Sequence, residues 1–206
     1  MPEKKTTSER LALFSDAVFA VIITIMVLEL KPPEEATLHA LLPLWPTALS
    51  YLVSYVFIAI IWVNHHYLFR FIRDATARLI WWNFAHLFMV SLLPFTTAWM
   101  SRTRLAAAPV FVYALNFVLI EIAYIAFERT TFAQATPSEL APPMRRIANL
   151  RSYLALALFS SATALAFWSP ATGFILVCCV LLIYLSPQLP ALLHSRRKGR
   201  KLHQPS

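Results

Sequence analysis

Glycine is nearly absent from this chain of 206 residues, in which only Gly173 and Gly199 occur. A Rossmann fingerprint and a Walker phosphate loop each need several glycines at fixed positions, so both are excluded. Cysteine is equally scarce. Cys178 and Cys179 are neighbours in an apolar run, and we interpret them as small buried hydrophobic side chains rather than as a disulfide or a metal site. The sequence therefore predicts no nucleotide chemistry and no cofactor.

Charged residues are also few, at 14% of the chain against about 25% in an average soluble domain. Hydrophobic residues make up 59%, a proportion typical of an integral membrane protein. The formal net charge of +8 comes from basic residues scattered in short groups between apolar blocks, rather than gathered on one soluble surface. We therefore expect membrane lipid, and no nucleic acid, as a partner.

Several apolar blocks are each long enough to cross a bilayer, which takes about 20 residues of helix. None of them shows the period-two alternation of a barrel strand. The sequence therefore predicts an all-α, polytopic membrane protein with six transmembrane helices in a single domain over residues 1–206. The blocks lie near residues 9–30, 42–66, 77–100, 107–128, 147–168 and 171–193.

The basic residues predict the orientation of these helices. With the N-terminus in the cytoplasm, three basic residues face outward, namely Lys31, Arg102 and Arg104. The other fifteen face inward: Lys4, Lys5, Arg10, Arg70, Arg73, Arg78, Arg129, Arg145, Arg146, Arg151, Arg196, Arg197, Lys198, Arg200 and Lys201. This bias follows the positive-inside rule and places both termini in the cytoplasm. We interpret the basic tail, about residues 194–206, as a topology anchor that contacts anionic lipid.

A polar segment, Arg10–Asp16, leads without a break into the apolar stretch 17–28. Bare polar groups are costly at a membrane entrance, so these side chains need partners. We expect Ser15 and Asp16 to form a structural network with neighbouring helices. The candidate donors are His65, His66, Trp82 and Asn83. Direct binding of an ion by Asp16, or proton relay through it, are the alternatives.

Helical geometry gives the first apolar block two faces. At about 100° per residue from Asp16, one stripe falls between about 80° and about 180°. It consists of Val21, Thr24, Ile25 and Leu28. Such a stripe is typical of ordinary packing. It could also form the wall of a pore, but only if several copies surrounded an axis, because one stripe cannot enclose a channel. An apolar constriction of that kind gates by dewetting.

Four stretches of the chain resemble one membrane protein family. The segment RLALFSD, residues 10–16, and the helix that follows it resemble the RxxxFSD signature and first helix of the transmembrane protein 175 potassium channel family. The stretch WVNHH, residues 62–66, and two stretches of the third block, residues 79–83 and 92–97, are also similar. The chain resembles a bacterial member of this family.

The resemblance implies a potassium-permeable channel in the bacterial plasma membrane, and not an enzyme. Family members of this size form homotetramers in which the first helix of each subunit lines a central pore. The resemblance places the narrowest hydrophobic layer at Val21, further layers at Ile25 and Leu28, and a pore-facing hydroxyl at Thr24. It assigns a structural role to the signature residues Arg10, Phe14, Ser15 and Asp16. With two glycines the chain has no TVGYG filter, so side chains must supply any selectivity.

Two further ionisable residues lie inside predicted spans, His86 and Glu121. Intramembrane ionisable groups raise a functional hypothesis by default. We interpret both as hydrogen-bonded or paired packing residues. The alternative function is a proton- or cation-coupled secondary transporter that uses Glu121, His86 or Asp16. We find no catalytic set of nucleophile and base, and no residues at metal-ligand spacing.

Overall fold

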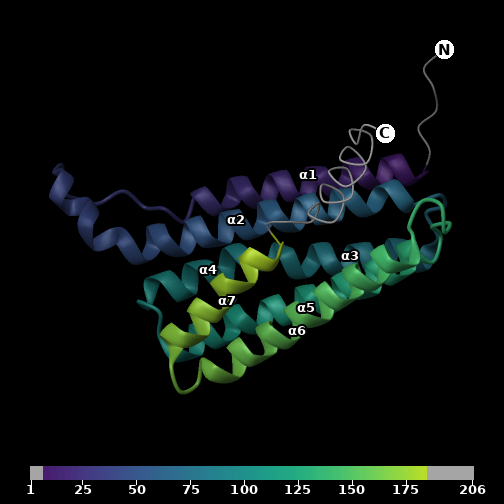
Figure 1. The fold of residues 1–206 in the computed structure, drawn as a ribbon. Coiled ribbons are helices and arrows are strands. Elements are labelled where there is room, and N and C mark those ends of the chain that lie inside the picture. The colour runs from purple at the N-terminus through teal and green to yellow at the C-terminus, as the bar shows by residue number, and fades with distance from the viewer. Residues whose placement is uncertain (1–6, 185–206) are drawn as a thin grey trace, which may run out of the picture.

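The computed structural model describes residues 7–184, so the predicted basic tail over residues 194–206 lies outside the described residues. Within residues 7–184 the chain is helical and has no β-strand, which confirms the predicted all-α class. Figure 1 shows an elongated bundle in which the long helices run alongside one another. The elements are α1 (Thr7–Val27), η1 (Leu38–Leu44), α2 (Trp45–Leu68), η2 (Phe69–Phe71), α3 (Ala77–Ser91), α4 (Leu93–Arg102), α5 (Ala107–Phe132), α6 (Pro142–Leu165) and α7 (Pro170–Tyr184).

Four helical segments of the described chain are long and apolar enough to cross a membrane, judged by length and composition. They are Thr7–Val27, Leu38–Phe71, Ala77–Arg102 and Ala107–Phe132. Helix α6 is as long as α2, but arginines occupy its first half. The apolar part of α7 that the structure describes is shorter, over Pro170–Val180. These segments make the chain a multi-pass membrane protein.

The predicted third span, residues 77–100, is in fact two helices. Helix α3 ends at Ser91 and α4 begins at Leu93, with Pro94 in its first turn. Proline has no backbone N–H, so it cannot donate to the carbonyl four residues earlier, at Val90. The missing bond and the bulk of the ring explain why the helix breaks at this point. Helix α4 therefore takes its own direction and leaves space beside α1.

Helix α5 lies at the centre of the bundle and packs against α3, α4, α6 and α7. Most of its apolar and aromatic side chains are buried. Leu119 and Ile122, on one side of the helix, are 37% and 48% exposed. Phe117 shows the burial most clearly: its ring centroid lies 4.4 Å from that of Phe57 on α2 and 5.1 Å from that of Phe159 on α6. Three helices thus meet at one side chain of α5.

The loops at the end of the bundle where α1 begins are tied together. We call this the inner end. The side-chain oxygen of Gln134, just after α5, accepts hydrogen bonds from the backbone N–H groups of Arg73 and Asp74, at 2.9 and 3.0 Å. The Arg73 guanidinium donates to both oxygens of Glu139, at 3.0 and 2.9 Å. The connection between α2 and α3 is therefore held against the connection between α5 and α6.

Gly173 lets α7 approach α6 closely. A Cβ atom at this position would lie 3.0 Å from the carbonyl oxygen of Ala162 and 3.0 Å from the Cα of Ala166. Both are backbone atoms, so a side chain could fit only if one helix moved. About one and a half turns further along α7, Cys178 is half-buried and Cys179 is exposed. The prediction that both cysteines are buried is therefore wrong for Cys179.

Replacing Gly173 by alanine should destabilise the protein by about 1–3 kcal/mol, the usual cost of overpacking a close contact. Thermal unfolding of the purified protein measures the change. Cys179→Ala, at an exposed position of the same helix, should shift stability by less than about 0.5 kcal/mol. Equal effects of the two substitutions would contradict the close approach of α6 and α7.

The stability contributed by the contact between Arg73 and Glu139 should depend on pH. The pKa of the Glu139 carboxyl is lowered from 4.5 to about 2, first by the backbone N–H of Thr136 and then by Arg73. Because the folded-state value lies below the ordinary one, the stabilisation is complete above about pH 4.5 and is lost as the pH falls towards about 2. The thermal midpoint of the wild type should therefore fall more steeply across this window than that of Glu139→Gln. Glu35→Gln, a change at an exposed carboxylate outside this contact, should behave like the wild type.

Candidate functional site

Helix α1 has one buried face and one exposed face. The buried residues recur at the spacing of one helix face: Leu11, Ser15, Phe19, Ile22 and Met26. On the opposite face Val21 is 54% exposed and Ile25 is 45% exposed. The angular separation predicted from the sequence is thus present, with polar Ser15 turned towards the bundle and the stripe turned away from it.

A chain of hydrogen bonds holds the buried face at the inner end. Asn83 on α3 is central: its amide nitrogen donates to the Ser15 hydroxyl at 3.0 Å, and its amide oxygen accepts from Nε2 of His65 at 2.7 Å. Ser15 donates in turn to the carbonyl of Leu11, at 2.9 Å. All three side chains are fully buried. The network joins α1, α2 and α3 at a level where water is excluded.

Asp16 has a different partner from those that we predicted. The indole N–H of Trp62 on α2 donates to its carboxylate at 2.8 Å. The ring centroids of Trp62 and His66 are 5.3 Å apart, so this histidine packs against the indole that binds the carboxylate. The sequence contained a signal for this contact, because Trp62 opens the stretch that ends at His65 and His66.

The remaining signature residues take less part in the network. The Phe14 ring packs edge-on against Phe84 of α3, with centroids 5.4 Å apart. Arg10 is exposed, and in the described part of the chain it makes no hydrogen bond. Trp82 likewise makes no hydrogen bond with the signature among the described residues. Of the four predicted donors, His65 and Asn83 are therefore the ones that reach the network.

The polar residue of the stripe, Thr24, uses its hydroxyl on its own helix. The hydroxyl lies within hydrogen-bonding distance of the carbonyl oxygens of Ala20 and Val21, at 3.1 and 2.9 Å. Its lone pairs remain available on the exposed face of α1. Leu28 lies just beyond the end of α1 and is 74% exposed. Its backbone N–H still bonds to the carbonyl of Ile25, at 3.0 Å, so the turn continues the stripe.

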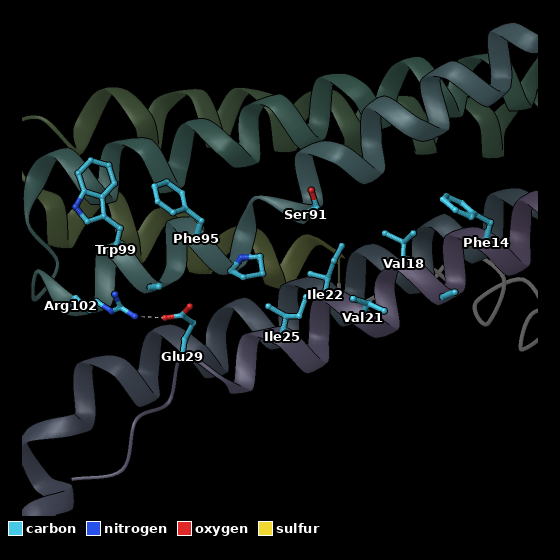
Figure 2. A pocket seen from close by; sticks show the side chains of 13 residues that line it. Phe14, Val18, Val21, Ile22, Ile25, Glu29, Ser91, Phe95, Trp99 and Arg102 are labelled. Carbon is cyan, nitrogen blue, oxygen red and sulfur yellow. Dashed lines mark hydrogen bonds and ion pairs between the residues drawn. The ribbon is translucent and has the colours of Figure 1, made fainter. Parts of the chain in front are cut away.

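An open apolar groove of about 790 Å³ lies between α1 and α4 (Figure 2). It exists because α4 takes a separate direction after the break at Pro94. Val21 and Ile25 form part of one wall, and Phe95 and Trp99 form part of the other. Phe95 is 64% exposed. The groove therefore presents a large apolar surface that water would not favour.

An ion pair closes one end of the groove. The Arg102 guanidinium at the end of α4 donates to the Glu29 carboxylate just after α1, at 2.6 Å (Figure 2). Both side chains are partly exposed, so the pair contributes modestly to stability. Its geometric effect is clear, because it fixes the outer end of α1 against α4. Helix α1 is thus held at both ends, by hydrogen bonds at the inner end and by an ion pair at the outer end.

His86 and Glu121 are buried inside the bundle, on α3 and α5, and do not line the groove. Nδ1 of His86 lies 3.3 Å from the carbonyl oxygen of Ile120. The His86 ring stacks on that of His65 at a centroid distance of 5.5 Å. Both contacts are with groups inside the bundle, and the packing role of His86 stays a prediction.

Comparison with known proteins identifies relatives for this chain. A family model described as the endosomal/lysosomal potassium channel TMEM175 matches residues 10–94, which include the signature. A potassium channel of Chryseobacterium sp. (strain P1-3) is 34% identical over 182 residues, or 88% of this chain and 94% of the relative. A potassium channel of Chamaesiphon minutus is 36% identical over 135 residues, or 60% of this chain and 64% of the relative.

The fold also has a solved counterpart. The crystal structure of a lysosomal potassium-selective channel TMEM175 homolog from Chamaesiphon minutus superposes with a TM-score of 0.77. The two chains are 27% identical in sequence, and the match covers 88% of this chain and 97% of the other. The similarity therefore extends from the signature to nearly the whole bundle.

The hydrogen-bond network predicts a large loss of stability for Asn83→Ala. The substitution leaves the buried imidazole N–H of His65 without its acceptor, at a cost of about 1–3 kcal/mol, and also removes the donor to the Ser15 hydroxyl, which keeps its bond to the Leu11 carbonyl. Thermal or denaturant unfolding of the purified protein measures the loss.

A matched control is Asn116→Ala. Asn116 is a buried asparagine on α5 whose amide atoms have no hydrogen-bond partner in the described part of the chain. This control should cost less than about 1.5 kcal/mol, because no hydrogen bond is lost. A similar cost for both variants would contradict the central role of Asn83.

Proposed function

The chain belongs to the TMEM175 potassium channel family, and we propose that it conducts potassium ions passively through a central pore lined by α1 of four identical subunits. Val21, Ile25 and Leu28 form the hydrophobic constriction in this proposal, and Thr24 supplies a hydroxyl at the same wall. The chain is a channel and not an enzyme. Potassium, and other monovalent cations, are its permeant ions.

The observation that carries this proposal is the exposed stripe of α1. The side of α1 opposite its polar contacts is apolar, and an apolar surface is usually covered by protein or by lipid. Here Val21 and Ile25 face an open groove beside α4 rather than a packed neighbour. Further copies of the chain, arranged around an axis next to α1, would cover the groove and turn the stripes towards a common centre. This supports a homotetramer, the assembly that the family resemblance implies.

The chemistry of the stripe supports gating by dewetting. Val21 and Ile25 are one helical turn apart, which is about 6 Å at 1.5 Å per residue. A ring of branched apolar side chains of this depth excludes water when narrow and admits a hydrated ion when wider. The Thr24 hydroxyl between the two layers offers lone pairs to a passing cation.

The positions of the basic residues support the orientation. Arg73 lies between α2 and α3, and Arg78 lies in the first turn of α3. Arg129 and Arg145 lie near the connection of α5 and α6, and all four are at the inner end where α1 begins. By the positive-inside rule this end is cytoplasmic. We place the protein in the bacterial plasma membrane as a single six-span domain with both termini inside. The α3–α4 pair forms one crossing, α6 and α7 form the last two, and anionic lipid contacts the basic inner end.

Ile25→Asn or Val21→Asn should raise the potassium conductance, because a polar side chain lowers the cost of wetting the constriction. Single-channel recording in planar bilayers measures the effect directly. A current that reverses near the potassium equilibrium potential is expected for both the wild type and the variants. Strict dependence of the flux on a second solute would instead indicate coupled transport.

Val27→Asn is the matched control. Val27 is 48% exposed on the same helix but lies outside the stripe, at about 20° from the direction of Asp16. It should leave the unitary conductance unchanged. If Ile25→Asn and Val27→Asn behave alike in correctly assembled protein, the pore assignment is wrong.

A further inference from the structure

Two small cavities lie inside the bundle, away from the α1–α4 groove. The larger has a volume of about 80 Å³ and lies at the inner end between α2, α5 and α6. The smaller has a volume of about 30 Å³ and lies deeper, between α2, α3, α5 and α6. Tyr124 of α5 lines both. No residue of the α1 stripe lines either cavity, so they are separate from the proposed pore.

Polar residues of α5 face these cavities at regular intervals. Glu121, Tyr124 and Glu128 are three and four residues apart, a spacing that puts them on one face of a helix. Glu121 lines the smaller cavity and Glu128 lines the larger. The two carboxyl-bearing positions are about 10 Å apart along α5 at 1.5 Å per residue. Tyr124 stands between them.

Glu128 is 1% exposed and only half satisfied by the protein. Its Oε2 accepts a hydrogen bond from the hydroxyl of Ser152 on α6, at 3.1 Å. Its Oε1 is buried and has no hydrogen-bond partner among the described residues. A buried charged oxygen without a donor is costly, so this atom needs either a proton or a donor from a molecule inside the cavity.

His86 has a similar unpaired atom in the smaller cavity. A carbonyl oxygen only accepts, so the contact with Ile120 places the ring hydrogen on Nδ1. Nε2 then carries a lone pair, and it is buried without a partner in the described part of the chain. Glu128 in the larger cavity and His86 in the smaller therefore each have one buried polar atom without a hydrogen-bond partner among the described residues.

Both cavities are large enough for water. A buried water needs about 10–15 Å³ and at least two polar partners. The larger cavity has room for more than one molecule and the smaller has room for one. The polar residues that line them are Asn64, His86, Glu121 and Tyr124 in the smaller, and Tyr67, Tyr124, Glu128 and Arg151 in the larger.

Cationic and hydroxyl-bearing side chains surround Glu128. Arg151 on α6 lines the same cavity and acts electrostatically on the Glu128 carboxyl. Arg129, the next residue of α5, also acts on it, but its guanidinium is hydrogen-bonded to the hydroxyl of Tyr153. Tyr67 of α2 and Tyr124 of α5 also line the cavity, and the Tyr124 side chain is hydrogen-bonded to Arg151. The carboxyl thus has a cation nearby, one hydroxyl donor and space for water, which are the elements of a site that exchanges a proton.

We propose that the larger cavity is a hydrated proton-binding site within each subunit, in which Glu128 takes up and releases a proton from the solution at the inner end. The proton arrives on water, adds to Oε1 of Glu128, and leaves by the same route, so no other reactant is needed. The Tyr124 hydroxyl joins the water of this cavity to the water beside His86. The site is distinct from the pore and from Asp16.

The site is connected to the anchor of α1. The Tyr124 ring lies 5.6 Å from that of His86, and His86 stacks on His65. His65 bonds to Asn83, which holds Ser15. A change of charge at Glu128 therefore acts on the helix that we propose lines the pore. This effect on current rests on the proposed function, whereas the proton-binding site itself does not.

Infrared difference spectroscopy of the protein in lipid, recorded while the pH is changed, tests the site. The wild type should show a carbonyl stretching band of a protonated carboxylic acid that shifts in D₂O, because the site is hydrated. Glu128→Gln should remove this band. Asp74→Asn, a change at an exposed carboxylate near the same end, should leave it in place. A band that survives in folded Glu128→Gln protein, or that is absent from the wild type, overturns the proposal.

Ser152→Ala provides a second variant in case Glu128→Gln does not fold. It removes the donor to Oε2 but keeps the carboxyl, so the band should shift in frequency without being lost. An unshifted band would show that the carboxyl observed is not Glu128.

Potassium current through the assembled channel tests the link to α1. The wild-type current should respond to the pH of the inner solution, and Glu128→Gln should lose that response while still conducting. An unchanged response overturns the link. Absence of potassium current from wild-type protein would contradict the proposed function, but the infrared result would still decide the proton site.

Discussion

The orientation of α1 depends on a network of buried polar side chains, which need hydrogen-bond partners because water cannot reach them. Ser15 is fully buried, and it is held by Asn83, which also binds His65. Any rotation of α1 about its axis would leave these groups without partners in a region from which water is excluded, at a cost of several kcal/mol. The side chains on the far side of the helix therefore point in one direction. That direction is the open groove beside α4.

The rest of the bundle also has a well-packed part and an open part. The central helix α5 packs against α3, α4, α6 and α7, and the polar residues on its inner half line small cavities. On the α1 side, the break before Pro94 turns α4 aside and leaves Val21 and Ile25 uncovered. A single chain is thus well packed around α5, whereas the apolar side chains of α1 beside α4 are not covered by the same chain. An assembly of subunits around α1 would bury the apolar surface that one chain leaves open.

Part of the site could be predicted from the sequence and part could not. Helical periodicity correctly separated Ser15 from the stripe of Val21 and Ile25, because the angle between two residues of one helix is independent of the fold. The partner of Asp16 was missed, since Trp62 was one of several donors at the end of α2 and only packing selects among them. The family resemblance assigned Arg10 a structural role, whereas its helical angle placed it on the side of the stripe, and its side chain is exposed. The pore-lining roles themselves remain a proposal.

By itself the sequence determined the helical class, the membrane setting and the two faces of α1, because length, composition and a period of 3.6 residues are local properties of the chain. Only the tertiary structure decided which donors meet Ser15 and Asp16, where the third span breaks, and that a groove and two internal cavities exist. These features depend on residues far apart in sequence, such as Asp16 and Trp62 or Glu128 and Ser152. Contacts between such residues depend on how the helices pack against one another, and the sequence of one helix does not determine that packing.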